Sequence, residues 1–79
     1  MPGTRFHPFR AWRVSKNLTR EEVIPMLAAF GRRTTANYLR RIEACDRRPS
    51  WDLAGALSAV TKGAVTREEL MGFGYRASP

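Results

Sequence analysis

The sequence predicts an all-α domain of about five short helices, and two observations carry this prediction. Apolar residues recur at helical spacing, as in Leu53, Ala54, Leu57 and Val60, whereas no stretch alternates apolar and polar residues as a half-buried strand would. Hydroxyl-bearing residues that suit helix N-caps stand in front of several of these stretches. With 79 residues the chain holds one domain, which excludes a multi-domain enzyme.

The first expected helix begins at Pro8, because proline suits the first helical position. It runs to Lys16 and places Phe9 and Trp12 on one face. Asn17 is expected to end it in a left-handed conformation, which asparagine tolerates better than most residues. We expect residues 1–7 to form a flexible arm, residues 8–71 the folded domain and residues 72–79 a tail.

A capping box predicts the start of the second helix. Thr19 and Glu22 have the spacing at which each side chain bonds the backbone amide of the other. Pro25 falls inside this helix and predicts a kink or an early break, since proline lacks the N–H of a helical hydrogen bond. Gly31 is expected to close the helix.

Three further caps predict the remaining helices. Thr35 precedes a third helix in which Leu39 and Ile42 face inward. Ser50 precedes a fourth helix of apolar character, and Thr66 opens a short fifth helix with a second capping box.

The positive charge is unevenly placed along the chain. Fourteen Lys or Arg stand against seven Asp or Glu, a formal charge of +7. Residues 1–20 carry five basic groups and no acid, residues 31–50 carry six Arg against two acids, and residues 51–79 carry three of each. This asymmetry indicates an anionic partner for the first part of the chain. The alternative is that scattered arginines only keep a small protein in solution.

Several classes of function are disfavoured by composition. A single cysteine, Cys45, forms no internal disulfide, and one histidine, His7, adds too little for a usual zinc site. We expect no metal, no cofactor, no membrane span and no secretory signal. We also expect no enzyme, because the sequence lacks paired carboxylates, a nucleophile with a base, and a glycine-rich phosphate loop.

Three stretches together resemble the Cro/XRE type of helix-turn-helix regulator. They are residues 9–22, the segment Tyr38-Leu-Arg-Arg-Ile-Glu43, and Arg47-Arg-Pro-Ser50. The segment over residues 61–70 is similar to the YdaS-like branch of that group. The resemblance covers about residues 9–70 and implies a five-helix lambda-repressor-like fold.

The resemblance implies a role for each part. The second helix crosses the DNA backbone, and the helix from Thr35 to Ala44 reads the major groove. Arg13 and Glu43 form a structural ion pair between the first and third helices. The chain departs from the family pattern in the longer segment between Ala28 and Arg33. It also departs at two family glycine places, which hold Asn17 and Cys45.

Candidate DNA contacts follow from the resemblance and from the chemistry of the bases. Asn37 suits adenine, Arg41 suits guanine, and Tyr38 suits a base, a thymine methyl group or a phosphate. The alternatives are that Asn37 bonds its own backbone, Arg41 is solvated and Tyr38 packs. The arm with Arg5-Phe6-His7 reaches along the duplex or is a disordered terminus. Expected phosphate contacts are Arg20, Arg32, Arg33, Thr35, Arg40, Arg47 and Arg48.

These expectations combine into a homodimeric, sequence-specific regulator of transcription, an autorepressor from a phage or mobile element in the bacterial cytoplasm. The expected partners are double-stranded DNA and a second copy, with no membrane and no small-molecule substrate. The fourth and fifth helices with Phe73 and Tyr75 are the expected dimer surface. Two alternatives stay open: a protein-binding adaptor, such as an antitoxin or an antagonist of another regulator, and an RNA-binding module.

Overall fold

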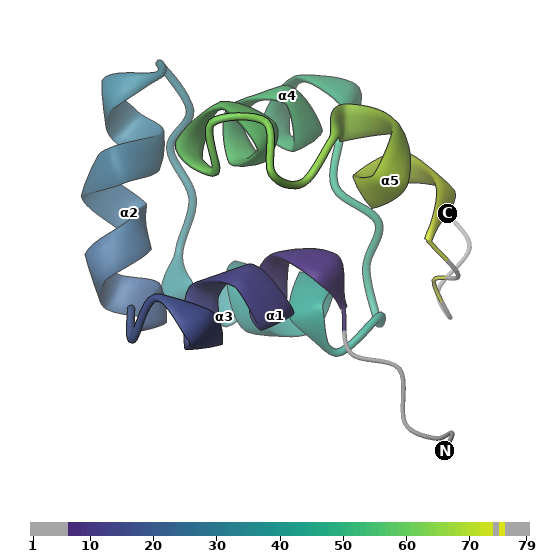
Figure 1. The fold of residues 1–79 in the computed structure, drawn as a ribbon, viewed down its shortest axis with the longest axis horizontal. Coiled ribbons are helices and arrows are strands. Elements are labelled where there is room, and N and C mark those ends of the chain that lie inside the picture. The colour runs from purple at the N-terminus through teal and green to yellow at the C-terminus, as the bar shows by residue number, and fades with distance from the viewer. Residues whose placement is uncertain (1–6, 74, 76–79) are drawn as a thin grey trace.

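The computed structural model describes residues 7–73 and 75, and this part of the chain contains five helices and no strand. The predicted all-α class is therefore confirmed for these residues. None of their helices combines the length and the apolar character needed to span a membrane. The helices are α1 (Pro8–Ser15), α2 (Arg20–Ala29), α3 (Ala36–Glu43), α4 (Trp51–Val60) and α5 (Arg67–Gly72) (Figure 1).

The predicted caps open four of the helices. Thr19 and Thr66 form capping boxes at α2 and α5, in which a glutamate three residues on bonds back to the cap amide. Thr35 accepts from an amide of the first turn of α3, and Ser50 does the same at α4. Because a cap contributes about 1 kcal/mol, these four residues set where the helices begin.

Left-handed residues other than glycine end three of the helices. Asn17 has φ 58°, as the sequence predicts, and Cys45 has φ 64° at the second place where the resemblance implies glycine. Lys62 has φ 56° ahead of Gly63, and α4 ends near this pair, as its sequence favours. Each non-glycine residue in this conformation costs about 1 kcal/mol, which the packing of the flanking helices must offset.

Proline does not break α2, so the early break, one of the two outcomes expected at Pro25, does not occur. The helix continues from Arg20 to Ala29 with Pro25 inside it. The missing N–H leaves the carbonyl of Glu21 without its helical donor. Glu21 and Pro25 are both exposed, so this loss falls on the side of α2 that faces solvent. Gly31, with φ 82°, follows the end of the helix as predicted.

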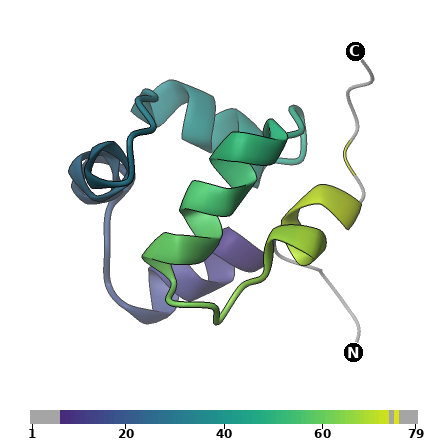
Figure 2. The same ribbon diagram turned by 90° about the horizontal axis from the view of Figure 1, so that it is seen from above.

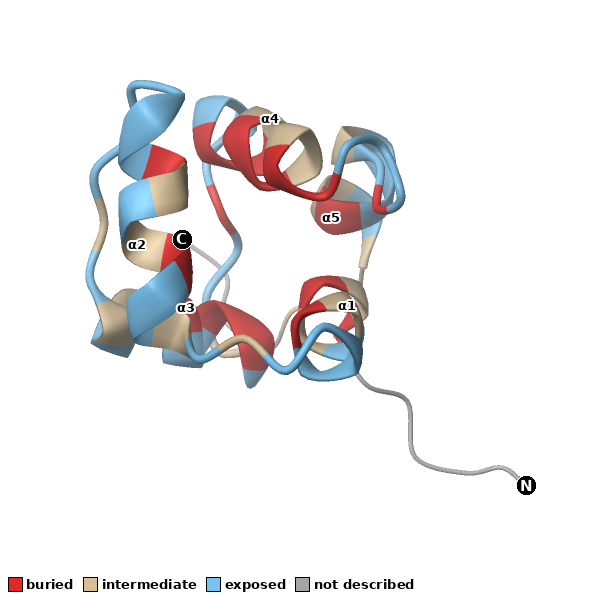
Figure 3. Ribbon diagram, turned by 60° about the vertical axis from the view of Figure 1, so that its left-hand side comes forward, coloured by how far each residue is buried: buried red, intermediate tan, exposed pale blue. Residues whose placement is uncertain are grey.

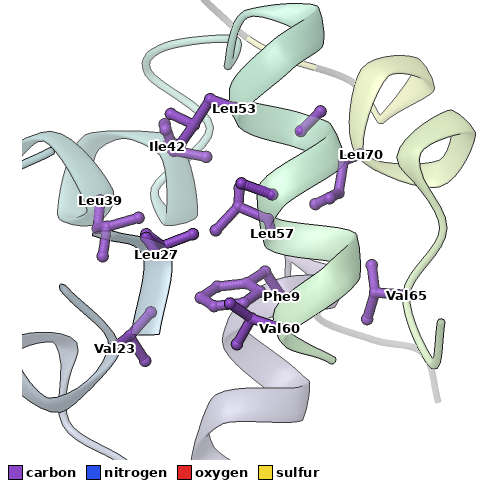
Figure 4. Packing of buried hydrophobic residues seen from close by; sticks show 12 residues of the cluster. Phe9, Val23, Leu27, Leu39, Ile42, Leu53, Leu57, Val60, Val65 and Leu70 are labelled. Carbon is purple, nitrogen blue, oxygen red and sulfur yellow. The ribbon is translucent and has the colours of Figure 1, made fainter. Parts of the chain in front are cut away.

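All five helices contribute to one apolar core. Leu57 of α4 lies in the middle of the cluster, between side chains of α2 and those of α5 (Figure 4). Each such side chain contributes about 1.5–3 kcal/mol when fully buried. The buried apolar residues are Phe9, Val23, Leu27, Leu39, Ile42, Leu53, Ala54, Ala56, Leu57, Val60, Val65 and Leu70.

Helix α4 organises the other helices around it. Seen from above, it crosses the middle of the molecule with α2 on one side and α5 on the other (Figure 2). Helices α1 and α3 lie below it in the first view (Figure 1). This arrangement leaves one side of α3 facing away from the core.

The connection between α2 and α3 returns the chain along α2. Amides of Gly31 and Arg32 bond to the carbonyls of Ala28 and Leu27 and close α2. The chain then runs back beside α2, so that α3 begins near the end of the molecule at which α2 starts (Figure 1, Figure 3). Of the segment from Ala28 to Arg33, Ala28 and Ala29 lie in α2, and the residues from Phe30 onward begin this return.

His7 belongs to the folded domain, so its assignment to a flexible arm is wrong. The side chain is 1% exposed and caps α1, with Nδ1 accepting from the amide of Phe9 at 3.2 Å. Because Nδ1 accepts, Nε2 carries the proton of the neutral ring and donates to Tyr75 Oη at 2.7 Å. The Tyr75 hydroxyl donates in turn to the carbonyl of Leu70 at 2.7 Å. Burial lowers the pKa of His7 to about 4, against an opposing effect of the Glu43 charge.

The chain after α5 packs against this histidine. The ring of Phe73 meets that of His7 edge-on at 5.4 Å, and the ring of Tyr75 lies 5.6 Å away. Both aromatic side chains thus contact their own chain and are half-buried there, and the dimer surface expected to include them stays a prediction. The arm residues Arg5 and Phe6, with the rest of residues 1–6, and tail residues 74 and 76–79 lie outside the described part.

Candidate nucleic-acid interface

A buried carboxylate ties three helices together. Glu43, at the end of α3, has a side chain only 1% exposed. Arg13 of α1 meets it with two hydrogen bonds, from Nε to Oε2 and from Nη2 to Oε1, both 2.9 Å. Nη1 of Arg13 donates to the carbonyl of Leu18 at 2.8 Å. This forked geometry is the strong form of an arginine–carboxylate pair, and it is the pair that the family resemblance implies.

Arg20 of α2 completes the cluster, which differs from its expected role as a phosphate contact. Its Nε lies 3.1 Å from Oε1 of Glu43, and its side chain is 31% exposed. Both guanidinium groups contact the same buried carboxylate, so the side chain of Arg20 is engaged inside the molecule. Together the three side chains hold α3 against α1 and α2.

The opposite side of α3 is polar and exposed. At 100° per residue, Asn37, Arg40, Arg41 and Ala44 share one face of the helix, and all four are exposed. The buried residues of α3 are Leu39, Ile42 and Glu43. No acidic side chain of α3 lies on the exposed face, which we name the outer face of α3.

Two residues of the outer face are joined to each other. Nη2 of Arg40 donates to Oδ1 of Asn37 at 2.8 Å, across the i, i+3 spacing of neighbours on a helix surface. Arg40 was expected to bind a phosphate, and Asn37 to contact adenine or to bond its own backbone. The spacing is visible in the sequence and could have indicated this pair.

Tyr38 is not on the outer face. It stands a quarter of a turn away, is half-buried and packs against the core. The guanidinium of Arg47 lies 6.0 Å from the centre of its ring. The structure therefore favours packing for Tyr38 over the expected contact with a base.

A shallow hollow lies beside the first turn of α3. Arg32 and Arg33 of the connection line it, with the cap residues Thr35 and Ser50. Both arginines are exposed, and Arg32 comes within 3.7 Å of the exposed carboxylate of Asp52. The caps use their hydroxyl oxygens as acceptors for amides of α3 and α4, which leaves the O–H of each free to donate. The hollow thus presents donors and positive charge.

The loop after α3 supplies two more exposed arginines. Arg47 lies over the ring of Tyr38, as described above, and Arg48 lies 5.7 Å from the centre of the Tyr75 ring. Cation–π contacts of this kind contribute about 0.5–1 kcal/mol at exposed sites, and they leave the guanidinium N–H groups at the surface. Two arginines therefore precede α3 and two follow it.

Among the described residues, His, Cys, Asp and Glu form no group of three or more that could hold a metal ion. His7 is engaged on both ring nitrogens.

No model of a known protein family, no curated protein and no solved structure matches the chain. The family resemblance therefore stays a prediction from the sequence.

Proposed function

We propose that the protein is a sequence-specific DNA-binding regulator of transcription, with a lambda-repressor-like helix-turn-helix fold, that reads the major groove with α3. The observation that carries this proposal is the outer face of α3. Asn37, Arg40 and Arg41 are exposed there without an acidic neighbour on the same face, while Glu43 anchors the opposite side of the helix. A helix fastened on one side and bearing amide and guanidinium groups on the other suits base recognition.

The dimensions and the charge support insertion into a groove. The major groove is about 12 Å wide and accepts one α-helix with its side chains. The arginine pairs at the two ends of α3 are then placed to meet phosphates on the flanking strands: Arg32 and Arg33 before it, Arg47 and Arg48 after it. Arg41 is the residue that we expect to contact guanine, through N7 and O6.

Homodimerisation is part of the proposal. One recognition helix makes too few base contacts for tight specific binding, and two copies spaced by one helical turn of DNA double their number. A dimeric repressor of its own operon, in the bacterial cytoplasm, fits a chain of this size. Neither a membrane nor a small-molecule substrate is part of this proposal.

Selection of bound sequences from a random duplex pool tests the proposal directly. We expect an enriched site with two related halves. Four phosphate contacts per subunit would make log affinity fall against log salt with a slope of about −4 for each subunit. Binding that shows no enriched sequence, or a slope near zero, would overturn the proposal and favour the protein-binding adaptor. Stronger competition by structured RNA at equal salt would favour the RNA-binding module.

A further inference from the structure

The side-chain amide of Asn37 has a defined orientation on the outer face of α3. Arg40 has only donors, so the atom of Asn37 that it contacts at 2.8 Å is the carbonyl oxygen Oδ1 and not the amide nitrogen. The hydrogen bond itself therefore settles which end of the amide is which. The NH₂ group of Asn37 is the end that stays open to a ligand.

The pair has little competition from other groups of the protein. Both residues are exposed, and no carboxylate in residues 7–73 and 75 forms an ion pair with Arg40. A hydrogen bond from a charged donor is stronger than one from a neutral donor, which strengthens the contact between Arg40 and Asn37. Asn37 lies in the first turn of α3, the part of a recognition helix that comes nearest to base edges.

The chemistry of the pair differs from that of a lone asparagine. A free carboxamide offers one acceptor and one donor side by side, which matches the N6 donor and N7 acceptor of adenine. In the pair, the oxygen already accepts a hydrogen bond from the guanidinium of Arg40, so Asn37 presents only its NH₂ group to the base. The pair is a surface of donors with a positive charge.

We propose that Asn37 and Arg40 act as one recognition unit that selects guanine over adenine, with Arg40 as the positioning residue of Asn37. Guanine presents two acceptors in the major groove, O6 and N7, whereas adenine places the N6 donor against this unit. The proposal rests on the proposed function, since it names the base that the outer face of α3 prefers. It replaces the adenine contact expected for Asn37 alone.

The test is selection from a random duplex pool with the wild-type chain and three variants. Asn37→Ala identifies the base position that this residue reads, because that position loses its preference. We expect guanine there for the wild type, favoured about fivefold or more over adenine. Arg40→Ala frees the carboxamide, so we expect the preference at the same position to move to adenine.

Arg33→Ala is the matched control, since it removes one exposed arginine near α3 that is outside the pair. We expect it to lower affinity for all sequences while guanine stays preferred. All four chains are compared by circular dichroism, and exposed sites should leave the melting curves superimposable.

The outcomes distinguish a failure of the recognition unit from a failure of the proposed DNA-binding function. A wild type that enriches a sequence but prefers adenine at the Asn37 position overturns the recognition unit and leaves the regulator in place. The same holds if Arg40→Ala retains the wild-type preference, or if Arg33→Ala changes it in the same way. A wild type that enriches no sequence overturns both the regulator and the unit.

Discussion

The two sides of α3 handle charge in opposite ways. On the inner side, the carboxylate of Glu43 is buried and meets Arg13 and Arg20 at 2.9 and 3.1 Å. On the outer side, Arg41 is exposed, and Arg40 donates a hydrogen bond to the neutral amide of Asn37. A charge that is buried and paired contributes to holding the fold, whereas a charge at the surface is available to a ligand. The comparison predicts large effects on stability from one side and effects on binding from the other.

The largest effect is expected from Glu43→Ala. The substitution strands the guanidinium of Arg13, which is only 10% exposed, and we expect a loss of about 3–5 kcal/mol in unfolding free energy. Urea denaturation followed by circular dichroism measures it. Glu21→Ala removes an exposed carboxylate and should cost less than about 1 kcal/mol. Equal losses for the two variants would refute the conclusion that the buried Glu43 pair holds the fold.

A second prediction concerns the buried imidazole of His7, whose lowered pKa keeps it neutral at pH 7. Its pKa is lowered by burial from 6.5 to about 4, so the unfolded chain takes up the proton at a higher pH than the folded one. The stability associated with neutral His7 is complete above about pH 6.5 and is lost as the pH falls towards 4. The difference between the two pKa values corresponds to about 3 kcal/mol of unfolding free energy.

Unfolding free energies between pH 7 and pH 4.5 measure this dependence. His7→Asn is the control, because asparagine is a good N-cap that does not titrate. We expect its stability to vary less with pH over the same range. A wild-type unfolding free energy that is constant between pH 6.5 and 4.5 would contradict a neutral His7 with a hydrogen bond at each ring nitrogen.

On the outer side, Arg41→Ala should weaken specific DNA binding by about 1–3 kcal/mol and spare both nonspecific binding and stability. Arg48→Ala should weaken both kinds of binding alike and reduce the salt slope by about 1, since we assign it to a phosphate. Affinities for a selected duplex and for random DNA, each at several salt concentrations, measure the two effects. If Arg41→Ala left the preferred sequence unchanged, α3 would not be the recognition helix.

The smallest effect is expected away from both sides of α3. Lys62 is exposed and left-handed at the end of α4, so Lys62→Gly should raise the unfolding free energy by about 0.5–1 kcal/mol. Thermal melts resolve a change of this size. A lowered stability would show that Lys62 contributes contacts that outweigh its backbone strain.

Helix starts were predictable from the sequence because their causes are local. Thr19, Thr35, Ser50 and Thr66 each bond an amide three residues away, so the pattern of residue types contains the geometry. The left-handed turn at Asn17 has the same local origin. The residue pattern did not decide between a kink and an early break at Pro25, because the cost of one lost hydrogen bond depends on exposure, which the sequence does not show.

The candidate site was predictable only in part. Exposure of Asn37 and Arg41 follows from the helical period of Leu39 and Ile42. The contacts of Arg20 and Tyr38 do not follow from this period, because each depends on which distant part of the chain packs beside the residue. Nothing in the residue pattern distinguishes an arginine that will meet a buried carboxylate from one that will meet solvent.

By itself the sequence determined the helical class, the starts of the helices and the concentration of positive charge before residue 51. Tertiary structure decided which of those charged side chains form ion pairs inside the molecule. It also decided that His7 and Tyr75, 68 residues apart, share a hydrogen bond. The physical reason is range: caps and helical periodicity act over three or four residues. An ion pair or a buried hydrogen bond instead exists only where packing brings two groups within about 3 Å and removes water from around them.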